Sequence, residues 1–362
     1  MFSLIAFLFL AMIVPAQVKV TGLGHGKSSG AGKPATLVFK RVYEPREHAF
    51  SLLVPAGWVT EGGVFRVNPL AQGGPAQSIE TKLDFAVKKD AAGSVMIRWL
   101  PDVLFFDNRN MPAAAMFPVG SNYNGMTVYP LVPAGVFLQQ VAFPYAHPQA
   151  AGVQMLRTQP ATKLAQGYQQ RINAMMPGLG FTYDAAVITV RYTENGMNYE
   201  ERMVGVIENM GRIGTGMWGN KGTFLVRVPA GEWKRWEPVL SIILSSVVLE
   251  PRWVAGEIQA LIKRGKIAIH TQQEVQQIEK AMLQHQQHTN AEIHNDMFLT
   301  LTDREEYVNP FTHQVETGSN QWLYRWENDN GDVIYTDQAD YNPNHDINLH
   351  ATGFKKTPVR KR

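Results

Sequence analysis

Residues 186–207 constrain the fold of this chain most strongly, because they predict two strands joined by a tight turn. The runs Ala186–Thr193 and Asn198–Ile207 flank the turn sequence Glu194-Asn195-Gly196. An Asn-Gly pair readily takes the positive φ angles that a short hairpin turn needs. The sequence therefore predicts an antiparallel strand pair here, and an antiparallel sheet around it.

Several further elements fit one mixed domain, which we place at residues 36–253. Strand-like runs occur at Phe50–Val54, Val64–Val67, Lys82–Val87, Ser94–Trp99 and Thr223–Val228. Apolar residues recur at helical spacing at Leu164, Tyr168, Ile172 and Met175, and again from Trp236 to Val247. Residues 101–150 contain seven prolines, which favours loops with short strands such as Val136–Phe143. We expect an α+β fold in which an antiparallel sheet is flanked by helices.

Three short segments of this domain follow one another in a recognisable order. They are Phe50-Ser-Leu-Leu-Val-Pro-Ala-Gly-Trp58 near its start, Gln159-Pro160 before the first long helix, and the closing helix Trp236–Val247. Their order resembles the PsbP-like α/β/α sandwich superfamily, which is named for an extrinsic photosystem protein and includes exported bacterial proteins of unknown role. The resemblance implies a non-enzymatic binding or assembly factor, and it carries over no catalytic residue.

The first sixteen residues predict export. From Phe2 to Val14 every residue except Ser3 is apolar, and the run ends at Pro15-Ala16. It is shorter than the roughly 20 apolar residues of a membrane span, and it matches the apolar core of a secretory signal peptide. A buried N-terminal strand or an uncleaved anchor is the alternative. Residues 17–35 follow as a Gly-rich linker, so we expect an extracytoplasmic protein, secreted or periplasmic.

Composition excludes several kinds of site and partner. The chain has no cysteine, so it has no disulfide, thiolate nucleophile or Cys-ligated zinc. Its net charge of +3 comes from the basic tail, residues 351–362, with Lys355, Lys356, Arg360, Lys361 and Arg362. The rest of the chain is nearly neutral, and we expect no nucleic-acid partner. The tail either contacts anionic surfaces or is a solvated terminus.

Two smaller parts are expected after residue 253. In residues 254–300, apolar residues recur at helical spacing between many glutamines, which predicts a helical arm. In residues 301–350, alternation places Trp322, Tyr324 and Trp326 on one face of a strand in a small β-hairpin module. This aromatic face either docks a partner, which we expect to be an envelope protein or a wall polymer, or covers the core of the module itself.

Two patterns are candidate metal sites. The oxygen-bearing residues Asp337, Asp340, Asn342, Asn344 and Asp346 resemble the first half of a calcium loop. His345 stands where the turn glycine is usual and Ala351 where the closing glutamate is usual, so an ordinary turn-rich loop is the alternative. His285, His288 and Glu292 share one stripe of the predicted arm, which suits either zinc or solvated side chains. Calcium is therefore a possible cofactor, and no cofactor is the simpler expectation.

No catalytic constellation assembles from the sequence. We therefore expect an exported, non-enzymatic binding or assembly factor that acts at the cell envelope or surface. The alternative is an extracytoplasmic hydrolase that acts on wall polymer through a carboxylate pair brought together by folding.

Overall fold

The protein was analysed as a computed structural model, which describes residues 39–71, 73–109, 116–175, 178, 180–212, 214–263, 297, 299, 301–302, 304–319, 322–329, 332–346, 349 and 352–360. The chain divides into two compact units between Asn295 and Asp296. The predicted signal peptide and linker, most of the predicted helical arm, and His285, His288 and Glu292 lie outside the described residues.

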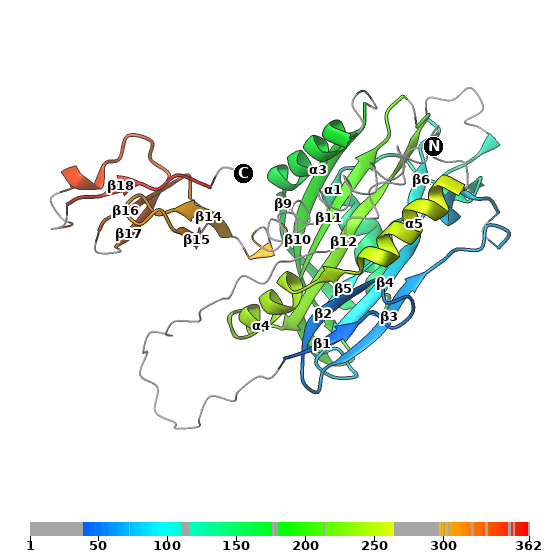
Figure 1. The fold of residues 1–362 in the computed structure, drawn as a ribbon, viewed down its shortest axis with the longest axis horizontal. Coiled ribbons are helices and arrows are strands. Elements are labelled where there is room, and N and C mark those ends of the chain that lie inside the picture. Colours follow the sequence, from blue (N-terminus) through cyan, green and yellow to red (C-terminus); the bar gives the residue numbers. More distant parts are fainter. Residues whose placement is uncertain are drawn as a thin grey trace. The chain divides into compact units, whose positions relative to one another are not determined.

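The first unit is built on one large, mostly antiparallel sheet. Its strands lie in the order β3 (Val59–Phe65), β4 (Lys82–Lys88), β5 (Met96–Trp99), β12 (Met217–Pro229), β11 (Met197–Asn209), β10 (Thr182–Glu194) and β9 (Ala151–Pro160). The short strands β6 (Leu104–Phe106), β7 (Asn122–Tyr123) and β8 (Met126–Val128) extend it beside β12. The long strands β9 to β12 twist and curl together (Figure 1).

The predicted central hairpin is confirmed. β10 and β11 pair from Thr182 opposite Asn209 to Glu194 opposite Met197. The turn residues Asn195 and Gly196 have φ angles of 50° and 75°. These are the positive angles for which an Asn-Gly turn was expected.

Helices cover both faces of the sheet. A helical segment made of α1 (Ala134–Phe137), the π-helical turn η4 (Leu138–Ala142) and α2 (Phe143–Ala146) lies on one face. On the other face lie α3 (Thr162–Met175), α4 (Trp233–Ser245) and a small sheet of β1 (Phe39–Tyr43), β2 (Phe50–Pro55) and β13 (Val248–Leu249). Asp184 accepts a hydrogen bond from the Ala134 N–H, while the ring of its neighbour Tyr183 contacts that of Tyr168 on α3. Successive strand side chains point to opposite faces, so α1 and α3 lie on opposite sides.

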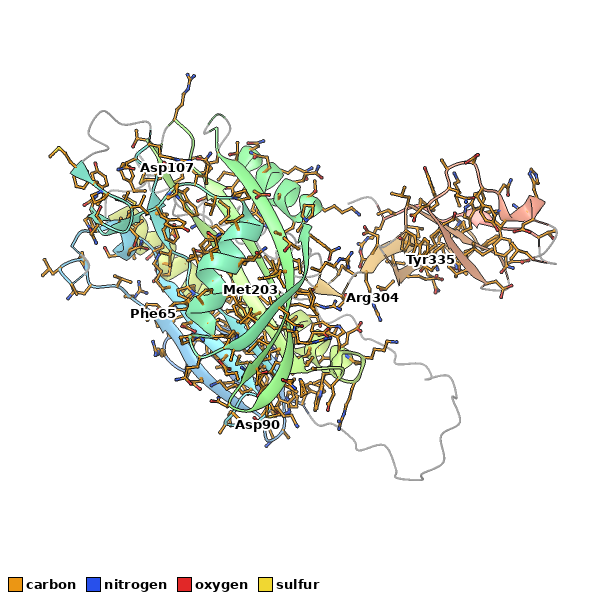
Figure 2. All side chains as sticks on the ribbon, turned by 180° about the vertical axis from the view of Figure 1, so that it is seen from behind. Phe65, Asp90, Asp107, Met203, Arg304 and Tyr335 are labelled. Carbon is orange, nitrogen blue, oxygen red and sulfur yellow. The ribbon has the colours of Figure 1, made fainter. Side chains whose placement is uncertain are left out.

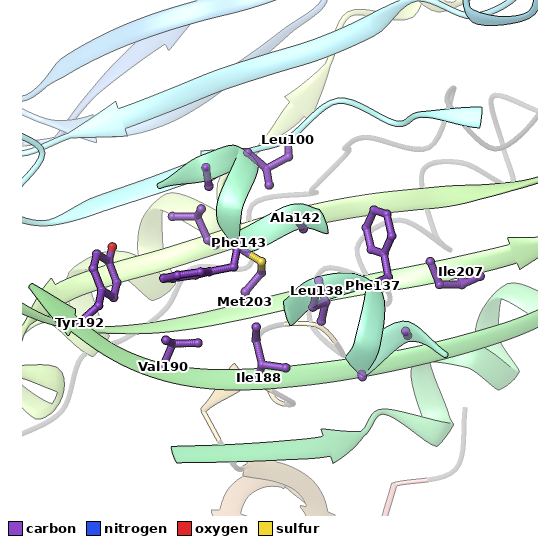
Figure 3. Close-up of a cluster of buried hydrophobic side chains, with 14 of the residues drawn as sticks. Leu100, Phe137, Leu138, Ala142, Phe143, Ile188, Val190, Tyr192, Met203 and Ile207 are labelled. Carbon is purple, nitrogen blue, oxygen red and sulfur yellow. The ribbon is translucent and has the colours of Figure 1, made fainter. Parts of the chain in front are cut away.

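The core on the α1 side is a cluster of aliphatic and aromatic side chains (Figure 3). Leu138 and Phe143 of the helical segment lie beside Ile188 and Met203 of the hairpin, and the Phe137 ring contacts those of Phe105 and Trp218. Leu138, Ile188 and Met203 are each 0% exposed. Because these side chains are fully buried, the loss of even one methylene group from this core lowers the stability of the fold.

The predicted strand Val136–Phe143 is wrong, because these residues are helical. The run contains β-branched and aromatic residues among prolines, which favoured a strand. Its buried members instead come in pairs about five residues apart, Phe137-Leu138 and Ala142-Phe143, and such pairs face the sheet from one side of a helix. Pro144 has no N–H for an α-helical ladder, and the N–H of Phe143 donates to Leu138 O as in a π-helical turn.

The two longer predicted helices are confirmed as α3 and α4. The expected domain boundary after residue 253 falls inside a further helix, α5 (Pro251–Lys263). Val254 is 0% exposed, and Glu257 Oε2 accepts a hydrogen bond from Thr81 Oγ1 at 2.7 Å. The start of α5 therefore packs as part of the first unit.

The second unit consists of two small sheets. β14 (Arg304–Val308) pairs with β15 (Val315–Ser319), and β16 (Tyr324–Glu327) lies between β17 (Val333–Thr336) and β18 (Lys355–Lys356). Phe354 is 5% exposed, and Val359 bridges to Tyr307. Residues 354–360, expected within the basic tail, thus take part in the fold of this unit. In the described part of the chain, no helix has the length and apolar character of a membrane span.

Candidate functional site

An open pocket of about 580 Å³ lies on the α1–α2 face of the large sheet. Its walls come from β3, β4, β5, the residues after α2, and the ends of β10 and β12. The turn between β4 and β5 can be located in Figure 2 by the labelled residue Asp90. The charged and titratable lining residues are Arg46, Glu61, Asp84, Lys88, Arg98, His147, Glu194 and Arg227. We call this site the charged pocket.

Asp84 and Arg98 form the best-defined ion pair on the pocket wall. Nε and Nη2 of Arg98 donate to Oδ1 and Oδ2 of Asp84, both at 2.9 Å. Ala86 lies opposite Arg98 in the register of β4 and β5, so Asp84 is a diagonal neighbour on the same face. The Tyr145 hydroxyl also donates to Asp84 Oδ2, at 3.0 Å. A two-pronged pair fixes the direction of the guanidinium as well as its charge.

The other two lining carboxylates, Glu61 and Glu194, also pair with lining cations, each through one contact. Lys88 Nζ contacts Glu61 Oε2. Arg227 Nη1 donates to Glu194 Oε2 at 2.5 Å, and its Nε and Nη2 donate to the Gly93 carbonyl at 2.9 and 2.6 Å. Arg227 therefore ties the end of β10 to the β4–β5 turn. Each of the three lining carboxylates has a lining cation as its partner.

His147 lies at the floor of the pocket, directly after α2, and its side chain is 2% exposed. Its Nε2 lies 2.8 Å from Glu201 Oε2, and its Nδ1 lies 3.3 Å from Glu194 Oε1. The Tyr192 hydroxyl donates to the same Glu201 oxygen at 2.9 Å. One imidazole thus joins carboxylates from both strands of the central hairpin.

Each carboxylate beside His147 has a further hydrogen-bond donor. Glu194 also accepts from Arg227, and Glu201 also accepts from Tyr192. Burial, together with the charge of Glu201, raises the pKa of Tyr192, so its phenol stays a neutral donor.

A second ionic cluster lies away from the charged pocket, around Lys221. Lys221 Nζ lies 3.0 Å from Glu80 Oε2, 3.9 Å from Asp102 Oδ2 and 4.0 Å from Glu208 Oε1. The Tyr183 hydroxyl donates to Glu208 Oε2 at 2.6 Å. The side chains of Lys221, Glu80, Asp102 and Glu208 are 2%, 2%, 8% and 1% exposed, so the cluster is shielded from solutes.

Burial changes the ionisation of this cluster. It raises the pKa of Asp102 to about 6 and the pKa of Glu208 to about 7. Burial lowers the pKa of Lys221, but Glu80, Glu208 and Asp102 outweigh this effect and hold it above its usual value. Such carboxyl pKa values suit a general acid, but a general acid must also reach its substrate. We therefore assign the cluster to stability.

The three aromatic candidates of the second unit lie in different surroundings. Trp322 is 45% exposed and precedes β16, whereas Trp326 within β16 is 8% exposed. Lys356 Nζ lies 4.6 Å from the centroid of the Tyr324 ring and 5.3 Å from that of Trp326. Tyr324 and Trp326 thus share one face under Lys356, and Trp326 belongs to the packed interior of its unit.

The oxygen-rich loop, the candidate calcium site, is held by hydrogen bonds within the chain. Asp337 Oδ1 accepts from the Leu323 N–H at 3.0 Å, and Asn342 Oδ1 accepts from the Asn344 N–H at 3.1 Å. The Asn344 side chain exchanges two hydrogen bonds with the backbone of Phe354, and Asp346 Oδ2 accepts from Tyr341 at 3.0 Å. No group of three or more His, Cys, Asp or Glu among the described residues is placed to hold a metal ion.

No protein-family model and no curated protein matches this chain. A solved structure that it resembles is the solution structure of cyanobacterial PsbP (CyanoP) from Synechocystis sp. PCC 6803, with 10% sequence identity and a TM-score of 0.25. The match covers 62% of this chain and 98% of that chain. A TM-score this low assigns neither a family nor a function. The mixed α+β architecture rests instead on the curled sheet and the helices on its two faces.

Proposed function

We propose that the protein is an exported, non-enzymatic binding protein that takes a small polar ligand into the charged pocket. The observation that carries this proposal is the pairing of every lining carboxylate with a lining cation. Such pairs fix charged groups in place before a ligand arrives, which lowers the entropic cost of binding. A concave site with a few convergent polar groups is typical of small-molecule binding.

A hydrolase is the second candidate, because folding does bring carboxylates together. Glu194 and Glu201 meet at His147, and Asp102 and Glu208 meet near Lys221. A glycosidase needs one protonated and one ionised carboxyl on either side of the scissile bond. An imidazole joins the first pair, and the second pair is shielded from solutes, so neither pair flanks an open space for a scissile bond.

Export rests on the apolar run that ends at Ala16. We expect mass spectrometry of the envelope or secreted fraction to find a chain that begins at Gln17. An intact Met1 in the cytosolic fraction would remove export from the proposal.

A docking role for the second unit is a further candidate. Trp322 and its neighbour Leu323 are 45% and 75% exposed, and an exposed tryptophan next to an exposed leucine suits contact with an envelope protein or wall polymer. We expect Trp322→Ala to weaken retention of the full chain on cell-wall polymer purified from the organism that makes the protein. The melting temperature of the chain should not change. Unchanged retention would rule out the polymer as the partner.

Thermal melting of the full chain tests the pocket proposal. A ligand that binds only the folded state raises the melting temperature, and a panel of polar metabolites of each charge serves as the probe. Gln149→Trp should suppress the shift, because Gln149 lines the pocket and the indole would narrow it without removing a charged group. Gln154→Trp on β9, which is not a lining residue, is the matched control and should leave the shift unchanged.

Two results would contradict the proposal. One is a panel in which no metabolite changes the melting temperature. The other is release of soluble fragments when the protein is incubated with wall polymer, which would favour the hydrolase.

A further inference from the structure

We infer that the ligand of the charged pocket carries a single negative charge on an oxyanion and that Arg46 receives it. This inference rests on the proposed binding function, and it names the chemical class of the ligand.

The pocket is lined by one more Arg or Lys side chain than carboxylates. The cations Arg46, Lys88, Arg98 and Arg227 line it together with the carboxylates of Glu61, Asp84 and Glu194. Three of these cations are paired with the three carboxylates. Within the described residues, no carboxylate lies at ion-pair distance from the Arg46 guanidinium, whose hydrogen bond is from Nη1 to Val64 O at 3.4 Å. One positive charge of the lining is left for a ligand.

The chain builds a loop that presents Arg46. Glu44 is 0% exposed, and its carboxylate accepts hydrogen bonds from the backbone N–H groups of Arg46, Glu47 and Val64 at 2.9, 2.8 and 2.9 Å. The Ala49 N–H is a fourth donor, at 3.4 Å, and a buried carboxylate with four such hydrogen bonds holds its loop in one conformation. Arg46 therefore differs from an ordinary surface arginine, because a hydrogen bond to the buried Glu44 carboxylate fixes its backbone.

Gly63 supplies the space that this loop needs. A Cβ atom at Gly63 would lie 2.3 Å from Glu44 Oε1 and 3.2 Å from Arg46 Cγ. The φ angle of Gly63 is also +144°, which an L side chain rarely adopts. The position that borders both Glu44 and Arg46 is thus occupied by the one residue that fits there.

The ligand class follows from the chemistry of the guanidinium. Arginine presents a planar fork of N–H donors that matches the two oxygens of a carboxylate or a phosphate diester. A single negative charge would neutralise the excess of the lining. A cation would instead face a site with net positive charge and is disfavoured.

Matched small probes test the inference on the full chain. N-acetylglycine carries one negative charge, N-acetylglycinamide is its neutral counterpart, and glycinamide is a cation at neutral pH. Dimethyl phosphate distinguishes a phosphate diester from a carboxylate as the oxyanion. Titrations at constant ionic strength, followed by amide NMR shifts, give the dissociation constant for each probe.

We expect N-acetylglycine or dimethyl phosphate to bind, and Arg46→Gln to weaken that binding about 10- to 100-fold. The substitution keeps the backbone N–H that Glu44 accepts, so the melting temperature should stay unchanged. Arg46→Lys should restore part of the affinity, because it keeps the charge but loses the fork. Arg252→Gln on α5 is the matched control, since Arg252 is exposed and does not line the pocket.

The possible failures are distinguishable. Binding of glycinamide, or of the neutral amide as tightly as the acid, overturns the inference but leaves the pocket as a binding site. Equal anion affinity in Arg46→Gln and the wild type also overturns it. If neither these probes nor the metabolite panel binds, the proposed function fails as well.

Discussion

His147 joins the two strands of the central hairpin through both of its ring nitrogens. The carboxylates of Glu194 and Glu201 come from β10 and β11, and the imidazole between them is 2% exposed. Removing one partner from a buried ionic group leaves the others uncompensated, which costs more than the pair itself contributes.

We therefore predict that His147→Leu lowers the free energy of unfolding by about 3 kcal/mol. The substitution leaves Glu194 and Glu201 without the imidazole that contacts both of them. Urea unfolding measures the effect, with Gln149→Ala as an exposed control that should change stability by less than about 0.5 kcal/mol. Equal stability of His147→Leu and the control would show that the imidazole does not bridge the carboxylates.

The buried cluster around Lys221 predicts a dependence of stability on pH. Burial raises the pKa of Asp102 from 3.8 to about 6 and the pKa of Glu208 from 4.5 to about 7. In that window the folded chain binds more protons than the unfolded chain, so these two groups make stability fall as pH rises.

Urea midpoints at about pH 5 and about pH 7 test this sign. We expect the midpoint of the wild type to be lower at the higher pH. The double variant Asp102→Asn, Glu208→Gln keeps the oxygen acceptors but cannot ionise, so its midpoint should change less between the two pH values. A steeper or equal change in the variant would contradict the assignment.

At the scale of elements, Trp322 and Trp326 lie in different surroundings, although alternation in the sequence predicted that both lie on one face of a strand. Trp326 is 8% exposed within the strand, and Trp322 before it is 45% exposed. We predict that Trp326→Ala destabilises the second unit by about 3–5 kcal/mol, as for other buried aromatic residues, whereas Trp322→Ala changes it by less than about 0.5 kcal/mol.

Hydrogen exchange in the full chain measures this difference in peptides that cover β14 and β16. Exchange should become faster in Trp326→Ala and remain unchanged in Trp322→Ala. Equal acceleration in both variants would show that Trp322 also belongs to the interior of the unit.

Elements defined by local chemistry could be predicted from the sequence. The Asn195-Gly196 turn and the helical spacing from Leu164 to Ile172 each depend on residues close in the chain, and both are confirmed. Val136–Phe143 could not be predicted in this way, because a short apolar run fits a strand or a helix until its buried side is known.

The charged pocket could not be predicted, because it depends on the order of strands in the sheet. Asp84 and Arg98 are 14 residues apart, and Glu194 and Arg227 are 33 residues apart. Neither spacing has meaning until β4 pairs with β5 and until β11 pairs with both β10 and β12. The sequence also did not identify which carboxylates come together, because those at His147 and at Lys221 lie on different strands and loops.

At the scale of the whole molecule, α5 decides where the first unit ends. Val254 is 0% exposed, and Glu257 bonds to Thr81, so a chain cut after residue 253 loses both contacts. We predict that residues 39–263 melt cooperatively alone and that residues 39–253 melt at least roughly 5 °C lower. Equal melting temperatures would show that α5 is dispensable for the first unit.

The central claim is that the charged pocket holds the ligand of this protein. A crystal structure of the full chain, grown with the metabolite that raises its melting temperature most, tests this claim most directly. We predict ligand density in the pocket between Arg46 and Arg98, with the negative group of the ligand at the Arg46 guanidinium. Density at any other place on the molecule, with the pocket filled by solvent alone, would contradict the account.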